Sequence, residues 1–375
     1  MMQLSDQERD ELGASARKFL DNEVSSERVR ALLDDADGLD RTAWSAIAEL
    51  GWAAILVPEE HGGMGATWAE MSIILHEVGR RVAPLPLLSS AVLAVEALVG
   101  GTSDALRSEW LPAVAAGERI LTVAAQGPTG SVVASELGAV LSTSAAGMRL
   151  NGSARFVPDA HIADAIVVAA RDANNAVTYV MVERGAPGVT VQVEPTVDQT
   201  RRLARVTFTD VTISDAALLV EPGTGAALHT RVAAAGAVAV CIDAVGAAEQ
   251  MMFTSSRYAV ERQQFGRPIG SFQAVKHHCA NMLIAVEASR AAVAFGINAL
   301  DDPSADVAEG AAVAKSFAGP ACADACQLAV QVHGGIGFTW EHDAHLYLKR
   351  TKLDEGLFGS TAWHRRRLGQ VVLSR

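Results

Sequence analysis

The sequence has few cysteines, few aromatic side chains and fewer basic than acidic residues. Its four cysteines among 375 residues are too few and too scattered for a disulfide framework or a zinc site, which favours a reducing, cytoplasmic compartment. The formal net charge of -12 disfavours nucleic acid and anionic membrane surfaces as partners. The acidic N-terminus also lacks the basic start and the apolar stretch of an export signal. We therefore expect a cytoplasmic protein that does not bind nucleic acid.

No apolar run of the sequence predicts a membrane span. The most apolar segment, residues 232–248, contains Asp243 near its middle, and a carboxylate in the centre of a spanning helix costs about 2.5 to 3.5 kcal/mol. Half of all residues are hydrophobic and a fifth are charged, a balance that permits a large buried core. We predict that residues 232–248 form a helix inside a globular fold.

Residues 1–118 carry the signals of a helical domain. Two capping boxes mark helix starts, Ser5 with Glu8 and Thr67 with Glu70, because each pair satisfies two backbone N–H groups at a helix N-terminus. Apolar residues follow each box at helical spacing. The prediction is an N-terminal helical domain.

The pattern changes twice after this region, at residues 119–222 and again at 223–375. In the first stretch, short β-rich runs alternate with turn residues, and the alternation at 205–213 predicts a half-buried strand, so we expect an antiparallel barrel or sandwich. The second stretch returns to helical patterns typical of a four-helix bundle. These helices are expected at about 229–262, 271–300, 306–332 and 347 to the end. The predicted fold class is α+β, with a β domain between two helical domains.

Two motifs in the C-terminal region have residues suited to a nucleotide. In the run 262–269, Arg-Gln-Gln-Phe-Gly-Arg-Pro-Ile, Arg262 can bind a diphosphate with two parallel hydrogen bonds and Phe265 can stack on a purine. The run 331–338, Gln-Val-His-Gly-Gly-Ile-Gly-Phe, allows close backbone approach at its glycines. It is not the strand-turn-helix fingerprint of a Rossmann site. The structural alternative for each motif is a simple helix end.

Four segments in this order resemble the acyl-CoA dehydrogenase family of flavoproteins. They are 58–63 (Pro-Glu-Glu-His-Gly-Gly), 198–202 (Asp-x-Thr-Arg-Arg), 262–269 and 331–338. The resemblance implies an acyl-CoA dehydrogenase-like fold, an FAD between the β domain and the C-terminal bundle, and an acyl-CoA thioester beside the flavin. It implies α,β-dehydrogenation of that thioester to a 2-enoyl-CoA, with an electron-transfer flavoprotein as electron acceptor. It also implies a dimer or a dimer of dimers.

The resemblance assigns the cofactor-binding residues. Arg262, Gln264 and Phe265 are expected to hold the adenosine diphosphate end of an FAD that belongs to a neighbouring subunit, and Gln331, Gly334 and Gly335 are expected to close around it. The family uses no metal, and the pair His342 and His345 does not predict one.

The catalytic base is the point at which this sequence departs most from the family. A carboxylate must remove the α-proton of the thioester, yet gap-free counts place the two known base positions on Phe358 and Gly236. Two carboxylates lie nearby: Glu355 precedes Phe358 by three residues, and Asp243 follows Gly236 by two helical turns. In the alternative interpretation, Asp354 and Glu355 lie on a solvated helix face, and Asp243 has a paired structural role rather than that of a base or substrate contact.

The β region departs from the family in two further places. The family reads an acidic residue, Pro or Gly, and then Gly-Ser-Asp where this chain has 125–131, Ala-Gln-Gly-Pro-Thr-Gly-Ser. The family's Trp-x-Thr beside the flavin ring corresponds to Phe156-Val-Pro158, and proline supplies neither a hydroxyl nor an N–H.

These departures leave two main hypotheses. The chain is either an acyl-CoA dehydrogenase in its own right or a catalytically silent subunit that supports the FAD of an active homologous chain. The resemblance includes actinobacterial heterotetramers of the second kind, which act on CoA thioesters of steroid side chains. A helical binding module and an acyl-CoA oxidase are further alternatives.

Overall fold

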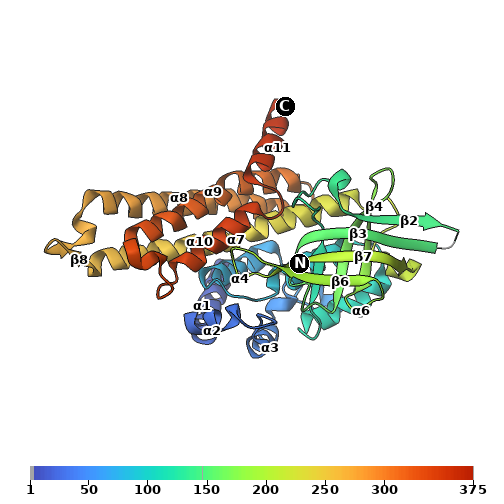
Figure 1. The fold of residues 1–375 in the computed structure, drawn as a ribbon, viewed down its shortest axis with the longest axis horizontal. Helices are drawn as coiled ribbons and strands as arrows, with labels where there is room; N and C mark the ends of the chain where they lie inside the picture. Colours follow the sequence, from blue (N-terminus) through green and yellow to red (C-terminus); the bar gives the residue numbers. More distant parts are fainter. Residues whose placement is uncertain (1–3, 146, 375) are drawn as a thin grey trace.

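The N-terminal third of the chain is helical. The computed structural model describes residues 4–145 and 147–374, and helices, then strands, then helices follow one another along the chain (Figure 1). Both predicted capping boxes, at Ser5 and Thr67, are confirmed. The helices are α1 (Asp6–Glu23), α2 (Ser26–Leu33), α3 (Arg41–Glu49), α4 (Trp68–Arg80), the π-helix Leu87–Ala94 with its continuation α5 (Val95–Gly100), and α6 (Asp104–Ala115).

A seven-stranded sheet occupies the middle of the chain, in the order β1-β4-β2-β3-β7-β6 with β5 on β4. The strands are β1 (Leu121–Ala124), β2 (Ala139–Ser144), β3 (Gly147–Pro158), β4 (Ala165–Arg171), β5 (Val177–Glu183), β6 (Val189–Glu194) and β7 (Leu203–Ile213). The expectation of a wholly antiparallel domain was wrong, because β1 pairs parallel to β4 from Leu121↔Ala165 to Ala124↔Val168. The antiparallel hairpin β2–β3 separates β1 from β4 in the chain, and β4 then runs in the same direction as β1 beside it.

Long helices form the C-terminal part and run side by side away from the sheet (Figure 1). They are α7 (Ala226–Glu261), α8 (Gln273–Asp301), α9 (Val307–His333), α10 (Ala344–Gly356) and α11 (Thr361–Leu373), and a two-stranded hairpin, β8 (Gln263–Gln264) and β9 (Arg267–Pro268), joins α7 to α8. The fourth predicted helix is broken, because Phe358 has φ +55° and Gly359 has φ +96°. Both values are left-handed and end a right-handed helix. We call residues 357–360 the closing turn.

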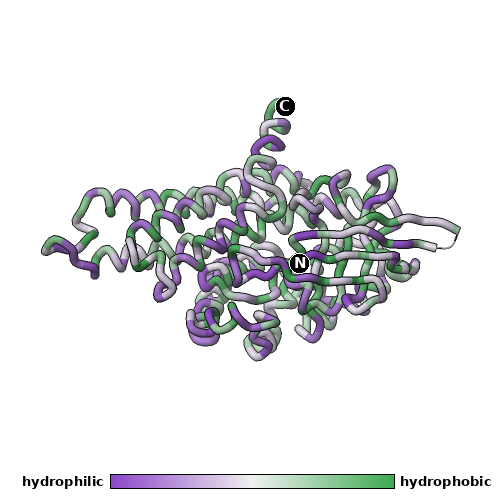
Figure 2. The backbone as a smooth tube through the Cα atoms, in the orientation of Figure 1, coloured by the Kyte–Doolittle hydropathy of each residue, from purple (hydrophilic) through white to green (hydrophobic). Residues whose placement is uncertain are grey.

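The predicted buried helix at residues 232–248 is confirmed as part of α7, and 89% of the most apolar window of α7 is buried. Two glycines let α4 and α7 cross closely, since a Cβ on Gly79 would lie 2.0 Å from the Asp243 carbonyl oxygen and one on Gly246 would lie 2.0 Å from that of His76. The tube coloured by hydropathy shows hydrophobic and hydrophilic residues alternating along the C-terminal helices (Figure 2).

One face of α8 is apolar but uncovered. Its most apolar window is only 33% buried, and Leu283, Ile284 and Phe295 are each about half exposed or more. Exposed apolar patches of this kind are typical of surfaces that bind proteins, membranes or ligands.

Candidate functional site

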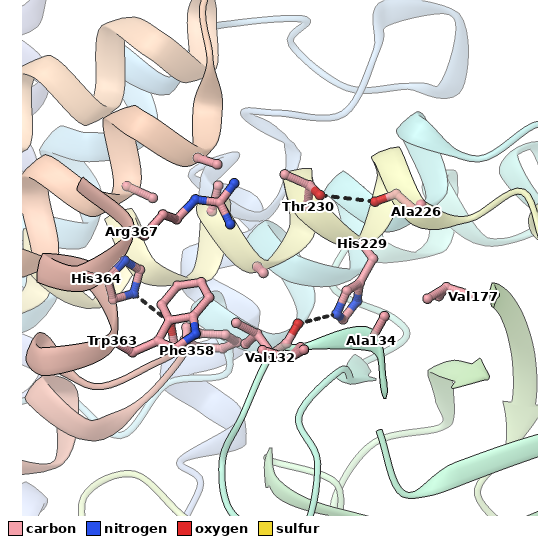
Figure 3. A pocket seen from close by; sticks show the side chains of 15 residues that line it. Val132, Ala134, Val177, Ala226, His229, Thr230, Phe358, Trp363, His364 and Arg367 are labelled. Atoms are coloured by element: carbon pink, nitrogen blue, oxygen red, sulfur yellow. Dashed lines mark hydrogen bonds between the residues drawn. The ribbon is translucent and has the colours of Figure 1, made fainter. Parts of the chain in front are cut away.

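A cavity of about 280 Å³ lies between the sheet domain and the C-terminal helices (Figure 3). Its walls come from the loop 132–134, the first turns of α7, the start of α9, and the segment 358–367. The helical wall from α7 and α9 is mostly alanine: Ala226, Ala233, Ala234, Ala308 and Ala311. The cavity therefore lies between the loop that follows the departing run 125–131 and Phe358, one of the two positions at which the family pattern places its base.

Phe358 and Gly236, the two positions at which the family pattern places its base, meet at one point in space. The ring of Phe358 lies on Gly236 so closely that a Cβ there would be 2.6 Å from Cδ1 of the ring. Phe358 is 2% exposed. No carboxylate stands at either position, and the aromatic ring fills the space between them.

Hydrogen bonds fix the backbone of Phe358 on both sides. Its N–H donates to Oε1 of Gln126 at 2.9 Å, and its carbonyl oxygen accepts from Nε2 of His364 at 2.9 Å. The Gln126 amide also donates from Nε2 to the carbonyl of Phe156 at 3.3 Å. Gln126 belongs to the run 125–131, where the family usually has an acidic residue, and an amide can accept from one backbone group while it donates to another, which an ionised carboxylate cannot do. This side chain ties the sheet domain to the closing turn.

A buried ammonium group holds the end of α10 just before the closing turn. Nζ of Lys315 donates to the backbone carbonyls of Asp354 and Glu355, the latter at 3.1 Å. Lys315 is fully buried, and this burial lowers the pKa of its ammonium group. Carbonyls at a helix C-terminus have no partner within the helix and attract a cation. Lys315 thus positions the turn that presents Phe358.

Asp243 lies in a buried ion cluster away from the cavity. Its two oxygens accept from Nε and Nη2 of Arg350 at 2.9 and 3.1 Å, and Nη2 of Arg201 lies 3.1 Å from Oδ1. Burial alone would raise the pKa of Asp243, but Arg350 and Arg201 outweigh it and lower that pKa to about 2. This geometry favours the paired alternative over the role of a base.

Glu355 does not line the cavity either. Its side chain is 28% exposed, and Oε2 lies 3.2 Å from Nζ of Lys352. Its neighbour Asp354 is not on a solvated face, as the alternative interpretation expected, but is 2% exposed and paired with Arg201. Burial raises the pKa of Asp354 well above its ordinary value, against the lowering effect of Arg201.

The predicted cofactor-binding residues lie at or just after the ends of α7 and α9, and β8 is at the far tip of the C-terminal helices (Figure 1). We call this set the diphosphate arm: Arg262, Gln264, Phe265, Gln331, Gly334 and Gly335. The end of α7 meets the end of α9 there, because the rings of Tyr258 and His333 stack with centroids 4.5 Å apart.

The diphosphate arm fits the adenosine diphosphate end of an FAD. Phe265 is 91% exposed, and a Cβ on Gly334 or Gly335 would meet nothing within 4 Å, so a ligand can approach both ring and backbone. Among residues 4–145 and 147–374, no carboxylate forms an ion pair with Arg262. A free guanidinium, an exposed ring and glycines that let a ligand come close to the backbone suit a diphosphate and an adenine.

The flavin-ring position of this chain fits less well. Pro158 has no N–H, and its carbonyl accepts from the hydroxyl of Thr122. The carbonyl of Phe156 is occupied by Gln126. The polar groups at this end of β3 are therefore used inside the protein rather than offered to a flavin.

Sequence reasoning missed one further contact of the cavity wall. His229 on α7 donates from Nε2 to the carbonyl of Val132 at 2.7 Å and accepts at Nδ1 from the hydroxyl of Tyr179 at 2.9 Å. Burial lowers the pKa of His229, so the ring is neutral, and the carbonyl fixes the proton on Nε2. No local motif signals this pairing, because its three members come from separate elements.

Comparison with known proteins places the chain in a family. Residues 6–118 and 223–373 match the family models described as acyl-CoA dehydrogenase, N-terminal domain, and acyl-CoA dehydrogenase, C-terminal domain. Acyl-CoA dehydrogenase IpdE2 of Mycolicibacterium smegmatis is 31% identical over 369 residues, which cover 98% of this chain and 99% of that protein. The crystal structure of the ChsE4-ChsE5 complex from Mycobacterium tuberculosis matches with a TM-score of 0.89 and 27% identity over 100% of both chains.

A more distant structure shows the same fold. Butyryl-CoA dehydrogenase from Megasphaera elsdenii matches with a TM-score of 0.89 and 21% identity over 100% of both chains. The predicted α+β fold, with its helical, sheet and helical parts in that order, is confirmed. The chain belongs to the acyl-CoA dehydrogenase family, the flavoprotein oxidoreductases that dehydrogenate acyl-CoA thioesters.

Proposed function

We propose that this chain is the base-free subunit of a heteromeric acyl-CoA dehydrogenase. It contributes its diphosphate arm to the FAD of a homologous partner and does not remove an α-proton at its own cavity. The observation that supports this proposal most directly is the ring of Phe358 on Gly236, which leaves no carboxylate and no space at either base position. The likeness to a complex of two chains, ChsE4 and ChsE5, agrees with it.

The distance between the cavity and the diphosphate arm supports a shared cofactor site. Gly236 and Arg262 lie at opposite ends of one uninterrupted stretch of α7, and the 1.5 Å rise per residue separates them by about 40 Å. A single FAD cannot bridge that separation. The arm of this chain therefore serves a cofactor whose reactive ring lies in another subunit.

The residues of this chain have binding roles in the proposed complex. Arg262 pairs with the diphosphate, Phe265 stacks on the adenine, and the glycines 334 and 335 admit the phosphates to the backbone. Bound FAD supplies the acceptor for the hydride that leaves the β-carbon. The partner supplies the carboxylate, and an electron-transfer flavoprotein takes the electrons from the complex.

The test is the flavin content and the reactivity of the chain alone and of the chain co-expressed with a homologous gene product. We expect little or no bound flavin in the chain alone. With the partner, we expect a yellow complex that bleaches anaerobically when short-chain, long-chain or steroid acyl-CoAs are added. A chain that bleaches by itself is a complete enzyme, and that result would refute the proposal.

Two matched variants locate the shared site. Arg262→Ala in this chain should reduce the flavin retained by the complex after gel filtration. Arg257→Ala removes an exposed arginine from the same helix outside the arm and should leave flavin retention unchanged. Equal retention by both variants would argue against the arm.

A further inference from the structure

Three aromatic rings meet where the two halves of the diphosphate arm, at 262–265 and 331–335, come together. The ring of His333, at the end of α9, stacks on Tyr258 of α7 with centroids 4.5 Å apart and 27° between the ring planes. His333 also contacts His342, whose ring centroid lies 4.3 Å away at 47°. We call Tyr258, His333 and His342 the ring stack. It joins α7, α9 and the segment that leads into α10.

On the α9 side, the ring stack is connected directly to the glycines of the arm. His333 immediately precedes Gly334, whose N–H donates to the carbonyl oxygen of Gln331. The 3₁₀ turn that follows packs tightly on His333, since a Cβ on Gly337 would lie 2.9 Å from the histidine Cβ. Nδ1 of His333 donates to the carbonyl oxygen of Ala329 at 2.8 Å, which fixes the orientation of the ring. The position of this ring therefore determines where the backbone of the arm's glycines lies.

On the α7 side, the ring stack is connected to the arginine and to the exposed ring of the arm. The carbonyl oxygen of Tyr258 accepts from the N–H of Arg262 at 2.8 Å. The carbonyl oxygen of Arg262 accepts in turn from the N–H of Ile269 at 2.8 Å, which closes the hairpin that carries Phe265. A displacement of Tyr258 would therefore move Arg262 and Phe265 together.

Both histidines of the ring stack are neutral near pH 7. Burial lowers the pKa of His333. Burial also lowers the pKa of His342, and the neighbouring His333 lowers it further. Two rings with centroids 4.3 Å apart repel each other when both take a proton. The stack is therefore most stable above the ordinary histidine pKa of about 6.5 and loses stability as the pH falls through the lowered values.

The groups around these two histidines do not reverse this sign. From the other elements, the charged and titratable neighbours are Tyr258 of α7, Arg30 of α2, which pairs with Asp343 at 2.6 Å, and His345 and Lys349 of α10. Asp343 raises the pKa of His342, but Arg30 lowers it, and burial lowers it most. Burial and Lys349 lower the pKa of His345 to about 4, so that ring is neutral as well.

We propose that the ring stack positions the two halves of the diphosphate arm for the FAD of the neighbouring subunit, and that the complex holds this FAD tightly only while both histidines are neutral. Tyr258 and His333 act through Arg262 and the glycines of the arm rather than by contact with the cofactor. The inference rests on the proposed function, which gives the arm a cofactor in another subunit. It sets an acid limit to the retention of the shared FAD.

The first experiment measures the rate at which flavin leaves the complex of this chain with its homologous partner, followed by flavin fluorescence. Release should be about threefold to tenfold faster in Tyr258→Leu, the range for loss of one aromatic pair. Tyr258→Phe keeps the ring and should release flavin at the wild-type rate. Equal rates for these two variants would remove the positioning role of the stack.

The pH dependence of the same rate tests the need for neutral rings. Release from the wild type should become faster as the pH falls from about 7.5 to about 5.5. His333→Phe keeps a ring that cannot take a proton, so its release should respond less to pH. His277→Gln removes an exposed histidine of α8 outside the stack and should keep the wild-type response. Slower release from the wild type at the lower pH would mean that a protonated histidine attracts the diphosphate, and would overturn this part of the inference.

Hydrogen exchange of the chain alone separates this inference from the proposed function, because it needs neither partner nor FAD. In Tyr258→Leu, exchange should become faster at both 262–268 and 334–338, whereas exchange in β1 should stay at the wild-type rate. Unchanged exchange in either half of the arm would show that the stack does not hold the two halves together, and would leave the proposed function standing. Bleaching of the chain alone by an acyl-CoA would refute that function and leave the exchange result intact.

Discussion

Replacing Gly236 by alanine tests the close contact between Gly236 and the ring of Phe358, which fills the two base positions. The new Cβ would lie 2.6 Å from Cδ1 of Phe358, whereas ordinary contacts lie between 3.4 and 4 Å, so the ring has to move by most of an ångström. Such overpacking of a buried site costs about 1 to 3 kcal/mol. The helix itself gains about 0.5 to 1 kcal/mol when alanine replaces an interior glycine. Gly236→Ala should therefore lower the free energy of unfolding by up to about 2.5 kcal/mol.

A double-mutant cycle with Phe358→Ala isolates the contact. Phe358→Ala alone should cost about 3 to 5 kcal/mol, as for other buried aromatic rings. With the ring gone, Gly236→Ala meets no obstacle and should stabilise by the helix gain alone, so the coupling energy is about 1 to 3 kcal/mol. Gly369→Ala on α11, where a Cβ meets nothing within 4 Å, is the control that Phe358→Ala should not affect. Urea unfolding followed by tryptophan fluorescence measures all variants, and additive effects at Gly236 and Phe358 would refute the argument.

Three further predictions concern the surroundings of the closing turn and the helix interface. Lys315→Met removes the donor to two carbonyls at the end of α10, and hydrogen exchange of residues 354–360 should become faster while that of the sheet stays unchanged. Gln126→Glu sets a carboxylate against a backbone carbonyl and should destabilise the protein by about 1 to 3 kcal/mol in thermal unfolding. Unchanged stability would contradict the role of Gln126 in holding the closing turn on the sheet domain. Burial lowers the pKa of His76, but Glu249 and Glu77 raise it above its ordinary value overall. The contribution of His76 to the free energy of unfolding is therefore complete below its unfolded pKa near 6.5 and is lost as the pH rises through its folded pKa. The stability of the wild type should fall over this pH range, and that of His76→Gln should not.

The local features of this fold could be predicted from the sequence, and the long-range contacts could not. The capping boxes and the diphosphate arm depend on residues that are neighbours in the chain, so their spacing already carries the information. A gap-free count reaches Phe358 and Gly236 one at a time, but nothing in the sequence says that the ring of one lies on the backbone of the other. Asp243 was ambiguous for the same reason, since its arginine partners come from the sheet region and from α10.

Two predictions were wrong: a single helix from residue 347 to the end, and a wholly antiparallel sheet. The prediction of one helix from 347 to the end passed over Gly359 and Ser360, which are a helix-stop residue with left-handed torsions and the N-cap of α11. The parallel pairing of β1 with β4 depends on where the intervening hairpin places β4, and strand alternation carries no information about direction.

In the proposed base-free subunit, the lack of a carboxylate at Phe358 and Gly236 and the packing around Phe358 are one change rather than two. A site that had lost only its carboxylate would contain an empty space beside Gly236, and cavities of that kind destabilise in proportion to their volume. Here the ring fills the space, and both backbone groups of Phe358 are hydrogen-bonded by side chains from other elements. The region has therefore become part of the core that joins the sheet domain to the helices. The diphosphate arm keeps its ring and backbone exposed at the other end of α7, as expected if the chain is required for its neighbour's cofactor rather than for chemistry of its own.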